Sequence, residues 1–117
     1  MLPPANRLRK EKDIKRVLGG RKSCRAGLLA CKTASSGPDA RRFCFIVSNR
    51  VSNRAVVRNR LKRRLREAVR ARLSRVRPGV DCVLIALPGA QDKTFAELET
   101  MVENVLRRAG ILEEHKT

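Results

Sequence analysis

The chain has 117 residues, a length typical of one domain. Its 28 Lys and Arg residues against 11 Asp and Glu give a formal net charge of +17, which favours a polyanionic partner and decides nothing about the fold. No apolar run approaches membrane-spanning length and the N-terminus lacks an apolar targeting segment, so we expect a soluble, cytoplasmic protein.

The first half of the chain predicts one helix followed by two strands. Residues 11–18 form a short amphipathic helix, because Ile14, Val17 and Leu18 share one helical face before Gly19-Gly20 ends it. The apolar runs 28–31 and 42–48 predict strands, and the turn-forming residues 34–39 separate them. Alternate side chains of the second run face opposite sides of a sheet: Phe43, Phe45 and Val47 on one, Cys44, Ile46 and Ser48 on the other.

The second half predicts a long helix, a strand and a final helix. The long helix is expected from an N-cap at Asn53 to about Arg77, where Pro78-Gly79 stops it. Residues 81–87 lack alternation, which predicts a strand covered on both faces. The last helix starts at the capping-box pattern Thr94-x-x-Glu97 and ends at Gly110, and its expected core face is Phe95, Leu98, Met101, Val102, Val105 and Leu106.

This order of elements (helix, strands, helix, strand, helix) predicts one α/β domain of the two-layer α+β kind. We expect the domain to span residues 1–112 and a polar tail to follow at residues 113–117. The cysteines at positions 24, 31, 44 and 82 form no closely spaced pair and have no nearby His, which argues against a zinc site or a disulfide framework.

The long helix is amphipathic and strongly basic. Its apolar face is expected to comprise Leu61, Leu65, Ala68, Val69, Leu73 and Val76, and its opposite face Asn59, Arg60, Arg63, Arg66 and Arg70. Residues 50–77 contain twelve basic residues and only one acid, Glu67, so the helix cannot neutralise itself through i,i+4 pairs. Arginines at this spacing lie about 5–6 Å apart and can bind successive phosphates.

The sequence shows no grouping of residues that could hydrolyse a phosphodiester. The single histidine, His115, stands in the polar tail, and Asp39, Asp81 and Asp92 are isolated at predicted turns or element ends. Hydrolysis of a phosphodiester would need clustered carboxylates around a metal or a His acid–base pair. We therefore expect neither catalytic nor metal-binding residues in this protein.

The basic helix carries a family motif. Its run Arg58-Asn59-Arg60-x-Lys62-Arg63, followed by Arg66-Glu67, resembles the signature helix of the bacterial ribonuclease P protein component. The segment from Asn6 through Leu18 resembles that family's N-terminal region, and the segment from Phe43 to Arg50 its central strand. The last helix, from Phe95 through Arg108, matches in placement, so the resemblance covers nearly the whole chain.

This resemblance implies a four-stranded mixed sheet with three helices, as in the second domain of a small-subunit ribosomal protein. The basic helix would lie on a left-handed crossover, although crossovers between parallel strands are right-handed in about 98% of cases. The family's role would be to bind ribonuclease P RNA and the 5′ leader of precursor tRNA, as a monomer in the holoenzyme. The RNA and its magnesium ions would cleave the leader, and the protein would bind no cofactor itself.

The resemblance also assigns residues to two surfaces. Those implied to contact the catalytic RNA are Arg50, Arg54, Arg58, Asn59, Arg60, Lys62, Arg63, Arg66 and Arg70. Those implied to line a leader-binding cleft between the first helix and the sheet are Arg7, Arg9, Lys12, Ile14, Leu18, Ala30 and Lys32. Many members of the family have aromatic side chains in this cleft, whereas Ile14, Leu18 and Ala30 are aliphatic.

Three other functions compete with this interpretation. A small ribosomal protein is similarly short and basic, and it would bind ribosomal RNA without a processing role. A DNA-binding basic helix of the zipper type would need a heptad seam continuing beyond Pro78-Gly79. A protein-only nuclease is least favoured, because the sequence lacks an acid–base constellation.

Overall fold

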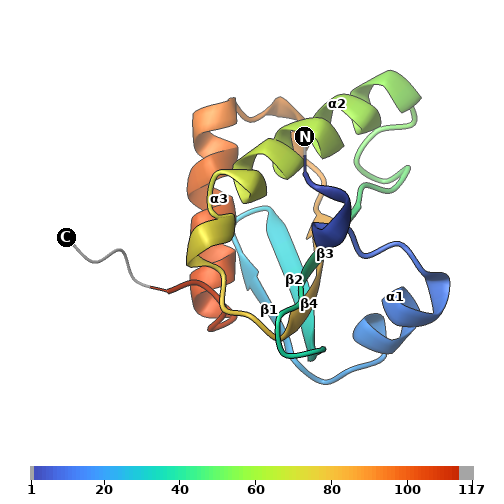
Figure 1. The fold of residues 1–117 in the computed structure, drawn as a ribbon. Helices are drawn as coiled ribbons and strands as arrows, with labels where there is room; N and C mark the ends of the chain where they lie inside the picture. Colours follow the sequence, from blue (N-terminus) through green and yellow to red (C-terminus); the bar gives the residue numbers. More distant parts are fainter. Residues whose placement is uncertain (1, 114–117) are drawn as a thin grey trace.

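The computed structural model describes residues 2–113, which form three α-helices and one four-stranded sheet (Figure 1). The elements are α1 (Glu11–Leu18), β1 (Ser23–Ala26), β2 (Leu29–Ser35), β3 (Arg41–Ile46), α2 (Ala55–Arg70), β4 (Val80–Ala86) and α3 (Phe95–Arg108). The predicted order of helix, strands, helix, strand and helix is confirmed. Of the predicted polar tail, only Glu113 is among the described residues.

The sheet is mixed, with the strand order β1-β2-β4-β3. Strand β2 pairs antiparallel with β1 and with β4, whereas β3 pairs parallel with β4, opposite Arg41↔Val80 through Ile46↔Ile85. Helix α2 therefore lies on the crossover between two adjacent parallel strands, as the family resemblance implies. The left-handed sense of this crossover stays a prediction.

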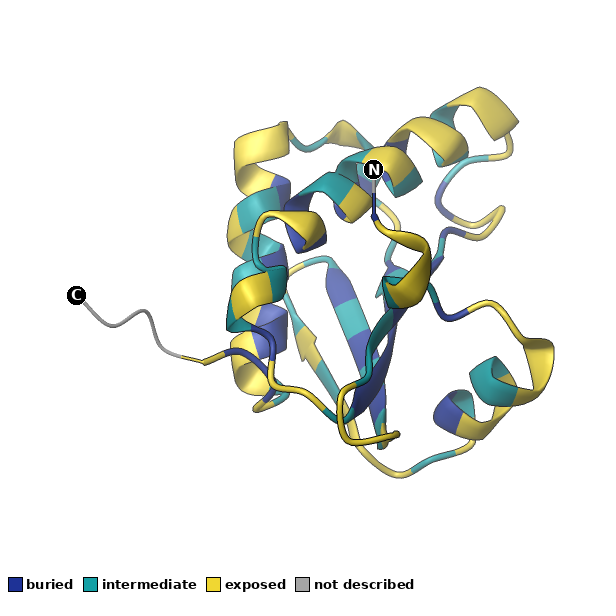
Figure 2. Ribbon diagram, in the orientation of Figure 1, coloured by how far each residue is buried: buried dark blue, intermediate teal, exposed yellow. Residues whose placement is uncertain are grey.

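Helices α2 and α3 cover one face of the sheet and form the main core with it (Figures 1 and 2). Helix α2 contributes Leu61, Leu65, Ala68 and Val69, and α3 contributes Leu98, Val102, Val105 and Leu106. Phe43 and Phe45 of β3 point into this core, whereas Cys44 and Ile46 belong to the opposite face, as the alternation predicts. The aliphatic helices and the two Phe rings thus fix α2 rigidly on the sheet.

Helix α1 packs on the other face of the sheet around a smaller core. Leu8, Val17 and Val83 are buried there, and Ile14 and Leu18 pack against them. Strand β4 is central and buried on both faces, which confirms the covered strand expected at residues 81–87. The sheet is consequently sandwiched between the α2–α3 layer and the shorter α1.

The residue pattern missed one strand and misjudged the extent of two others. The strand expected at residues 42–48 is β3, which ends at Ile46 and leaves out Val47 and Ser48. Strand β1 was not predicted, because Ser23-Cys24-Arg25-Ala26 is short, polar and half-exposed on the sheet edge. Strand β2 starts near the predicted position but continues to Ser35, into residues assigned to a turn. A two-residue turn joins β1 to β2. Gly27 is the first residue of this turn and has φ +58°, a conformation that favours glycine.

The predicted boundaries of the long helix are also wrong. Helix α2 ends at Arg70 instead of Arg77, and a short 3₁₀ turn, Leu73–Arg75, follows it. The apolar periodicity continues past the helix end because Val76 is still buried, in an isolated bridge with Leu112. The N-cap is Arg54, which makes no side-chain capping bond, instead of Asn53.

Helix α3 agrees with its sequence at both ends. Thr94 accepts a hydrogen bond from the Glu97 backbone N–H at 3.1 Å, and the Thr94 backbone N–H donates to the Glu97 carboxylate at 3.0 Å, which completes the capping box. Gly110 follows the helix with φ +75°. One core assignment is wrong, since Phe95 is 39% exposed at the first turn.

Candidate nucleic-acid interface

The outward face of α2 is a continuous basic surface. Asn59, Arg60, Arg63, Arg66 and Arg70 are exposed along it, as predicted, while the opposite side of the helix is buried in the core (Figure 2). The burial of the apolar side fixes which way these side chains face. A rigid helix therefore presents guanidinium groups at the spacing that phosphate binding requires.

The N-terminal end of α2 strengthens the positive potential. Its first turn contains no acidic residue, and its N-cap makes no side-chain hydrogen bond, so the helix dipole is not offset there. Arg50 and Arg54 are exposed in the connection that leads to this end. Backbone N–H groups and arginines thus converge at a terminus that favours an anion.

Three residues of the predicted surface are partly engaged by the protein itself. Arg70 pairs with Glu67 on the same helix at 3.2 Å. The Arg58 guanidinium is half-buried and donates to the carbonyl oxygen of Ser52 at 3.0 Å, which ties the preceding connection to the helix. Lys62 is half-buried and lies near Cys44, whose thiol has a pKa raised by burial although Lys62 and Arg66 act to lower it. Arg58 and Lys62 therefore lie at the border of the basic surface and also contact the rest of the protein.

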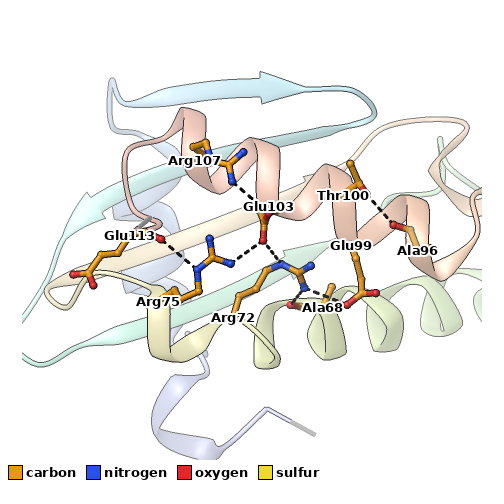
Figure 3. Close-up of polar contacts among 9 residues, drawn as sticks. All are labelled: Ala68, Arg72, Arg75, Ala96, Glu99, Thr100, Glu103, Arg107 and Glu113. Carbon is orange, nitrogen blue, oxygen red and sulfur yellow. Dashed lines mark hydrogen bonds and ion pairs between the residues drawn. The ribbon is translucent and has the colours of Figure 1, made fainter. Parts of the chain in front are cut away.

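The basic surface ends where acidic residues of α3 begin to pair with arginines (Figure 3). Arg72 contacts Glu99 at 3.3 Å and Glu103 at 3.2 Å, and its guanidinium also donates to the Ala68 carbonyl at 2.9 Å. Arg75 contacts Glu103 at 2.8 Å. The pairing acids come from another helix, so inspection of the basic segment alone could not separate these arginines from the exposed ones.

The predicted leader-binding residues divide into two places. Ile14 and Leu18 of α1 pack on the sheet, and the Lys32 ammonium donates to the Leu18 carbonyl at 2.8 Å, with Ala30 half-buried on the same strand as Lys32. Lys12 is exposed on α1. The structure thus brings the predicted α1 and β2 residues to one side of the sheet, where their side chains are aliphatic or basic.

Arg7 and Arg9 lie elsewhere. They line a hollow of about 380 Å³ with Leu2, Leu8, Phe43, Cys44, Phe45 and Arg66. The Leu8 backbone N–H donates to the Phe43 carbonyl at 2.8 Å, and Arg7 donates from Nε to the Leu2 carbonyl, also at 2.8 Å. The N-terminal segment therefore meets α2 across the edge of β3, and Arg66 joins the two predicted surfaces.

A buried carboxylate fixes α1 against the sheet. Asp81 is fully buried in β4, and its carboxylate accepts hydrogen bonds from Arg42 at 2.8 and 2.7 Å and from Arg16 of α1. Burial acts to raise the pKa of Asp81, but its bonds to the arginines outweigh this effect and lower the pKa. The sequence pattern places Asp81 at the end of an element, as a turn or cap residue would be, and that role is wrong because its carboxylate is buried and bound by two arginines.

Groups that could perform hydrolysis do not come together in the described part of the chain. Residues 2–113 contain no group of three or more His, Cys, Asp or Glu side chains that could hold a metal ion. Asp39 is exposed, whereas His115 lies outside the described residues. Within the same range, no helix is both long and apolar enough to span a bilayer.

Comparisons with known proteins agree on one family. The ribonuclease P family model matches residues 2–110. The ribonuclease P protein component of Gluconacetobacter diazotrophicus is 42% identical over 114 residues, covering 95% of this chain and 97% of that protein. The corresponding protein of Roseiflexus castenholzii is 38% identical, covering 93% and 89%.

Solved structures give the same result. The ribonuclease P protein of Staphylococcus aureus superposes with a TM-score of 0.82 at 27% identity, covering 99% of both chains. That of Thermotoga maritima gives a TM-score of 0.78 at 25% identity, covering 87% of this chain and 96% of the other. Sequence motif, fold and relatives coincide over almost the full length, and the chain belongs to the ribonuclease P protein family.

Proposed function

We propose that this chain is the protein subunit of ribonuclease P and assists removal of the 5′ leader from precursor tRNA. The observation that carries the proposal is the exposed basic face of α2, held rigidly on the sheet by its buried side. This face would bind the phosphate backbone of ribonuclease P RNA. The residues proposed for it are Arg50, Arg54, Arg58, Asn59, Arg60, Lys62, Arg63, Arg66 and Arg70.

The leader would lie on the α1 side of the sheet and reach α2 at the edge of β3. The hollow lined by Arg7, Arg9 and Arg66 supports this path, because it joins the N-terminal segment to the basic helix. Lys12 and Lys32 would add phosphate contacts, and Ile14, Leu18 and Ala30 would offer apolar contact in place of base stacking. Aromatic stacking contributes about 1–3 kcal/mol per base, so we propose weaker leader binding than an aromatic-lined cleft provides.

The division of labour that we propose is the one that the family resemblance implies. The protein would neutralise phosphates and position the substrate as a non-catalytic subunit, while the RNA and its magnesium ions hydrolyse the phosphodiester. The protein would bind no cofactor itself. We also propose that it acts in the cytoplasm, as a monomer within the holoenzyme.

Reconstitution tests the proposal. The full chain, added to its cognate ribonuclease P RNA at a magnesium concentration where the RNA alone is slow, should accelerate 5′ cleavage of precursor tRNA. A substrate with a leader of several nucleotides should gain more than one with a single-nucleotide leader. Cleavage that is equally slow with and without the protein would contradict the proposed function.

A matched pair of variants separates binding from catalysis. Asp39→Ala removes an exposed carboxylate and should leave the stimulation unchanged, because the protein supplies no catalytic acid. A variant with Arg60, Arg63 and Arg66 all changed to Ala should lose most of the stimulation at physiological salt and regain part of it at low salt. Loss of activity in Asp39→Ala would instead indicate a catalytic carboxylate.

A further inference from the structure

Three of the four cysteines gather on the sheet face beneath α3. Cys24 comes from β1, Cys31 from β2 and Cys82 from β4, and all three belong to the core that α3 covers. The Cys24 thiol also lies 3.4 Å from the Val105 carbonyl of α3. Cys44 belongs to the opposite face of the sheet. This thiol cluster has no place in the proposed RNA-binding function.

Cys24 and Cys31 have the geometry of a pair that can be joined covalently. They stand directly opposite each other in the antiparallel β1–β2 hairpin, and their sulfur atoms are 3.3 Å apart. Directly opposite residues of antiparallel strands have Cα atoms about 4.5–5.5 Å apart. A disulfide spans Cα separations of about 4.4–6.8 Å, so the bond requires only a small approach of the two sulfurs.

The hydrogen bonds within the cluster single out Cys31. It interacts with the thiols of both Cys82 and Cys24, and despite the opposing effect of burial these bonds lower its pKa to about 7. The pKa of Cys24 is raised to about 12 by burial and by its bond to Cys31. Cys31 is therefore the thiol that ionises first, with Cys24 beside it as a protonated donor.

A surface hollow is lined by both cysteines. It has a volume of about 220 Å³ and is lined by Arg21, Lys22, Ser23, Cys24, Cys31, Thr33, Arg108 and Ala109. Cys31 itself is only 1% exposed, which excludes bulky reagents but leaves this approach for a very small one. Of these side chains, Arg108 acts to lower the pKa of Cys24, but burial of the Cys24 thiol outweighs this effect.

We propose that Cys31 and Cys24 form an oxidation site for hydrogen peroxide, in which Cys31 is the reacting thiolate and Cys24 the resolving thiol. The Cys31 sulfur attacks one peroxide oxygen, the O–O bond breaks, and the departing hydroxide takes a proton to leave as water. Cys31 becomes a sulfenic acid. The Cys24 sulfur then gives up its proton and attacks the Cys31 sulfur, the S–O bond breaks, and a second water departs. Two thiols are thereby oxidised to one disulfide, and one peroxide is reduced to two waters.

Cys24 is the resolving thiol, and Cys82 is not, for two structural reasons. Cys82 is 0% exposed and pairs in register with Thr33, so it lies diagonally from Cys31 on the neighbouring strand. Cys24 is half-buried, stands directly opposite Cys31 and lines the same hollow. The role left to Cys82 is that of a hydrogen-bond donor that supports the Cys31 thiolate.

Peptide mapping tests the site in the reduced full chain. Trypsin cleaves after Lys22, Arg25 and Lys32, and so separates Cys24 in residues 23–25 from Cys31 in residues 26–32. After treatment with hydrogen peroxide and alkylation, these two peptides should appear joined, and the four free thiols should fall to two. Dithiothreitol should restore all four. Unchanged thiols, or a link from residues 26–32 to the Cys82 peptide at residues 76–93, would overturn the proposal.

Three variants assign the roles. In Cys24→Ser the sulfenic acid should persist and be trapped on residues 26–32 by dimedone that is present while the oxidised chain is unfolded in denaturant, whereas in Cys31→Ser both the adduct and the link should be absent. Cys44→Ser is the matched control on the other sheet face and should keep the link. If dimedone labels nothing in Cys24→Ser, Cys31 is not the reacting thiol and the proposal fails. These readouts do not depend on RNA, so they stand apart from any failure of the proposed function.

Discussion

Arginines of two kinds lie in the segment from α2 through the 3₁₀ turn. Arg60 and Arg63 are exposed on the outer face of α2, whereas the side chain of Arg72 is 15% exposed and contacts Glu99 and Glu103 (Figure 3). Arginines of the first kind are available to phosphates. Those of the second kind join the end of α2 to α3, so equal charge does not give them an equal role.

A comparison of two variants measures this difference. Changing both Arg60 and Arg63 to Ala should weaken binding of ribonuclease P RNA and flatten the dependence of log K on log salt, by about 0.7–0.9 for each lost phosphate contact. The free energy of unfolding should change by only about 0.5 kcal/mol, as for other surface substitutions. Binding titrations at several salt concentrations and denaturant unfolding supply the two quantities.

The matched substitution is Arg72→Ala. It removes the arginine that pairs with the partly buried Glu99 and one of the three arginines that contact Glu103, and it should lower the free energy of unfolding by about 1–3 kcal/mol. The salt dependence of RNA binding should keep its slope in this variant. If Arg72→Ala flattened the dependence of log K on log salt as much as the Arg60 and Arg63 variant does, Arg72 would contact the RNA despite its pairing with α3.

At the scale of elements, α1 is held by charge as much as by apolar contact. Arg16 of α1 and Arg42 of β3 both bind the buried Asp81 carboxylate, and Asp13 of α1 approaches Arg42 at 3.7 Å. Helix α1 has eight residues and buries little surface. Among the described residues of this helix, only Val17 is fully buried. The ion pairs therefore set the position of α1, which forms one wall of the proposed leader site.

Asp81→Asn should destabilise the protein in a pH-dependent way. The pKa of Asp81 is lowered in the folded state, so its ion pairs stabilise the fold above about pH 4, the usual pKa of Asp, and this contribution is lost as pH falls through the folded-state pKa. At pH 7 the free energy of unfolding of the variant should be lower by about 3 kcal/mol. This is the low end of the range for a broken buried ion pair, because both arginines are partly exposed.

Denaturant unfolding of both proteins from pH 7 down to pH 2 checks this expectation. The difference between them should shrink toward acid pH, where the native carboxylate is protonated. Asp39→Asn, at an exposed position, is the matched control and should behave like the unchanged chain. A difference that stays constant with pH would assign the effect to packing instead of charge.

Elements with a strong internal pattern were predictable from the sequence, and those defined by their neighbours were not. Helix α1 occupies the predicted residues, and the capping box marks the start of α3 as expected. Strand β1 escaped prediction because its polar residues become a strand only by pairing with β2. Apolar periodicity could not mark the end of α2, since Val76 is buried whether or not the helix continues.

The candidate site was likewise predictable from the sequence only in part. The outward face of α2 follows from helical spacing within one element, so the exposed positions from Asn59 to Arg70 were predictable. The positions of Arg7 and Arg9 beside Arg66 depend on how the N-terminal segment crosses β3, which spacing does not reveal. The pairing of Arg72 and Arg75 with Glu103 likewise depends on the packing of α2 against α3.

At the scale of the whole molecule, the net charge of +17 acts on folding and on binding in opposite directions. The sequence has 28 basic side chains, and the fold has a radius of gyration of 13.2 Å, so mutual repulsion among the basic side chains opposes the compact state. The same repulsion is relieved when RNA phosphates approach. A polyanion should therefore stabilise this fold by binding it and by removing its self-repulsion.

Salt should separate these two effects. Raising monovalent salt from about 50 to 200 mM screens repulsion over distances near 10 Å, so the melting temperature of the free protein should rise. Over the same range, affinity for ribonuclease P RNA should fall by about 10³–10⁵-fold if six to ten phosphates are contacted. Thermal unfolding of the free protein and binding titrations at matched salt measure both trends. A melting temperature that falls with salt would show that favourable ion pairs, such as those of Asp81 and Glu103, outweigh the repulsion among the exposed arginines.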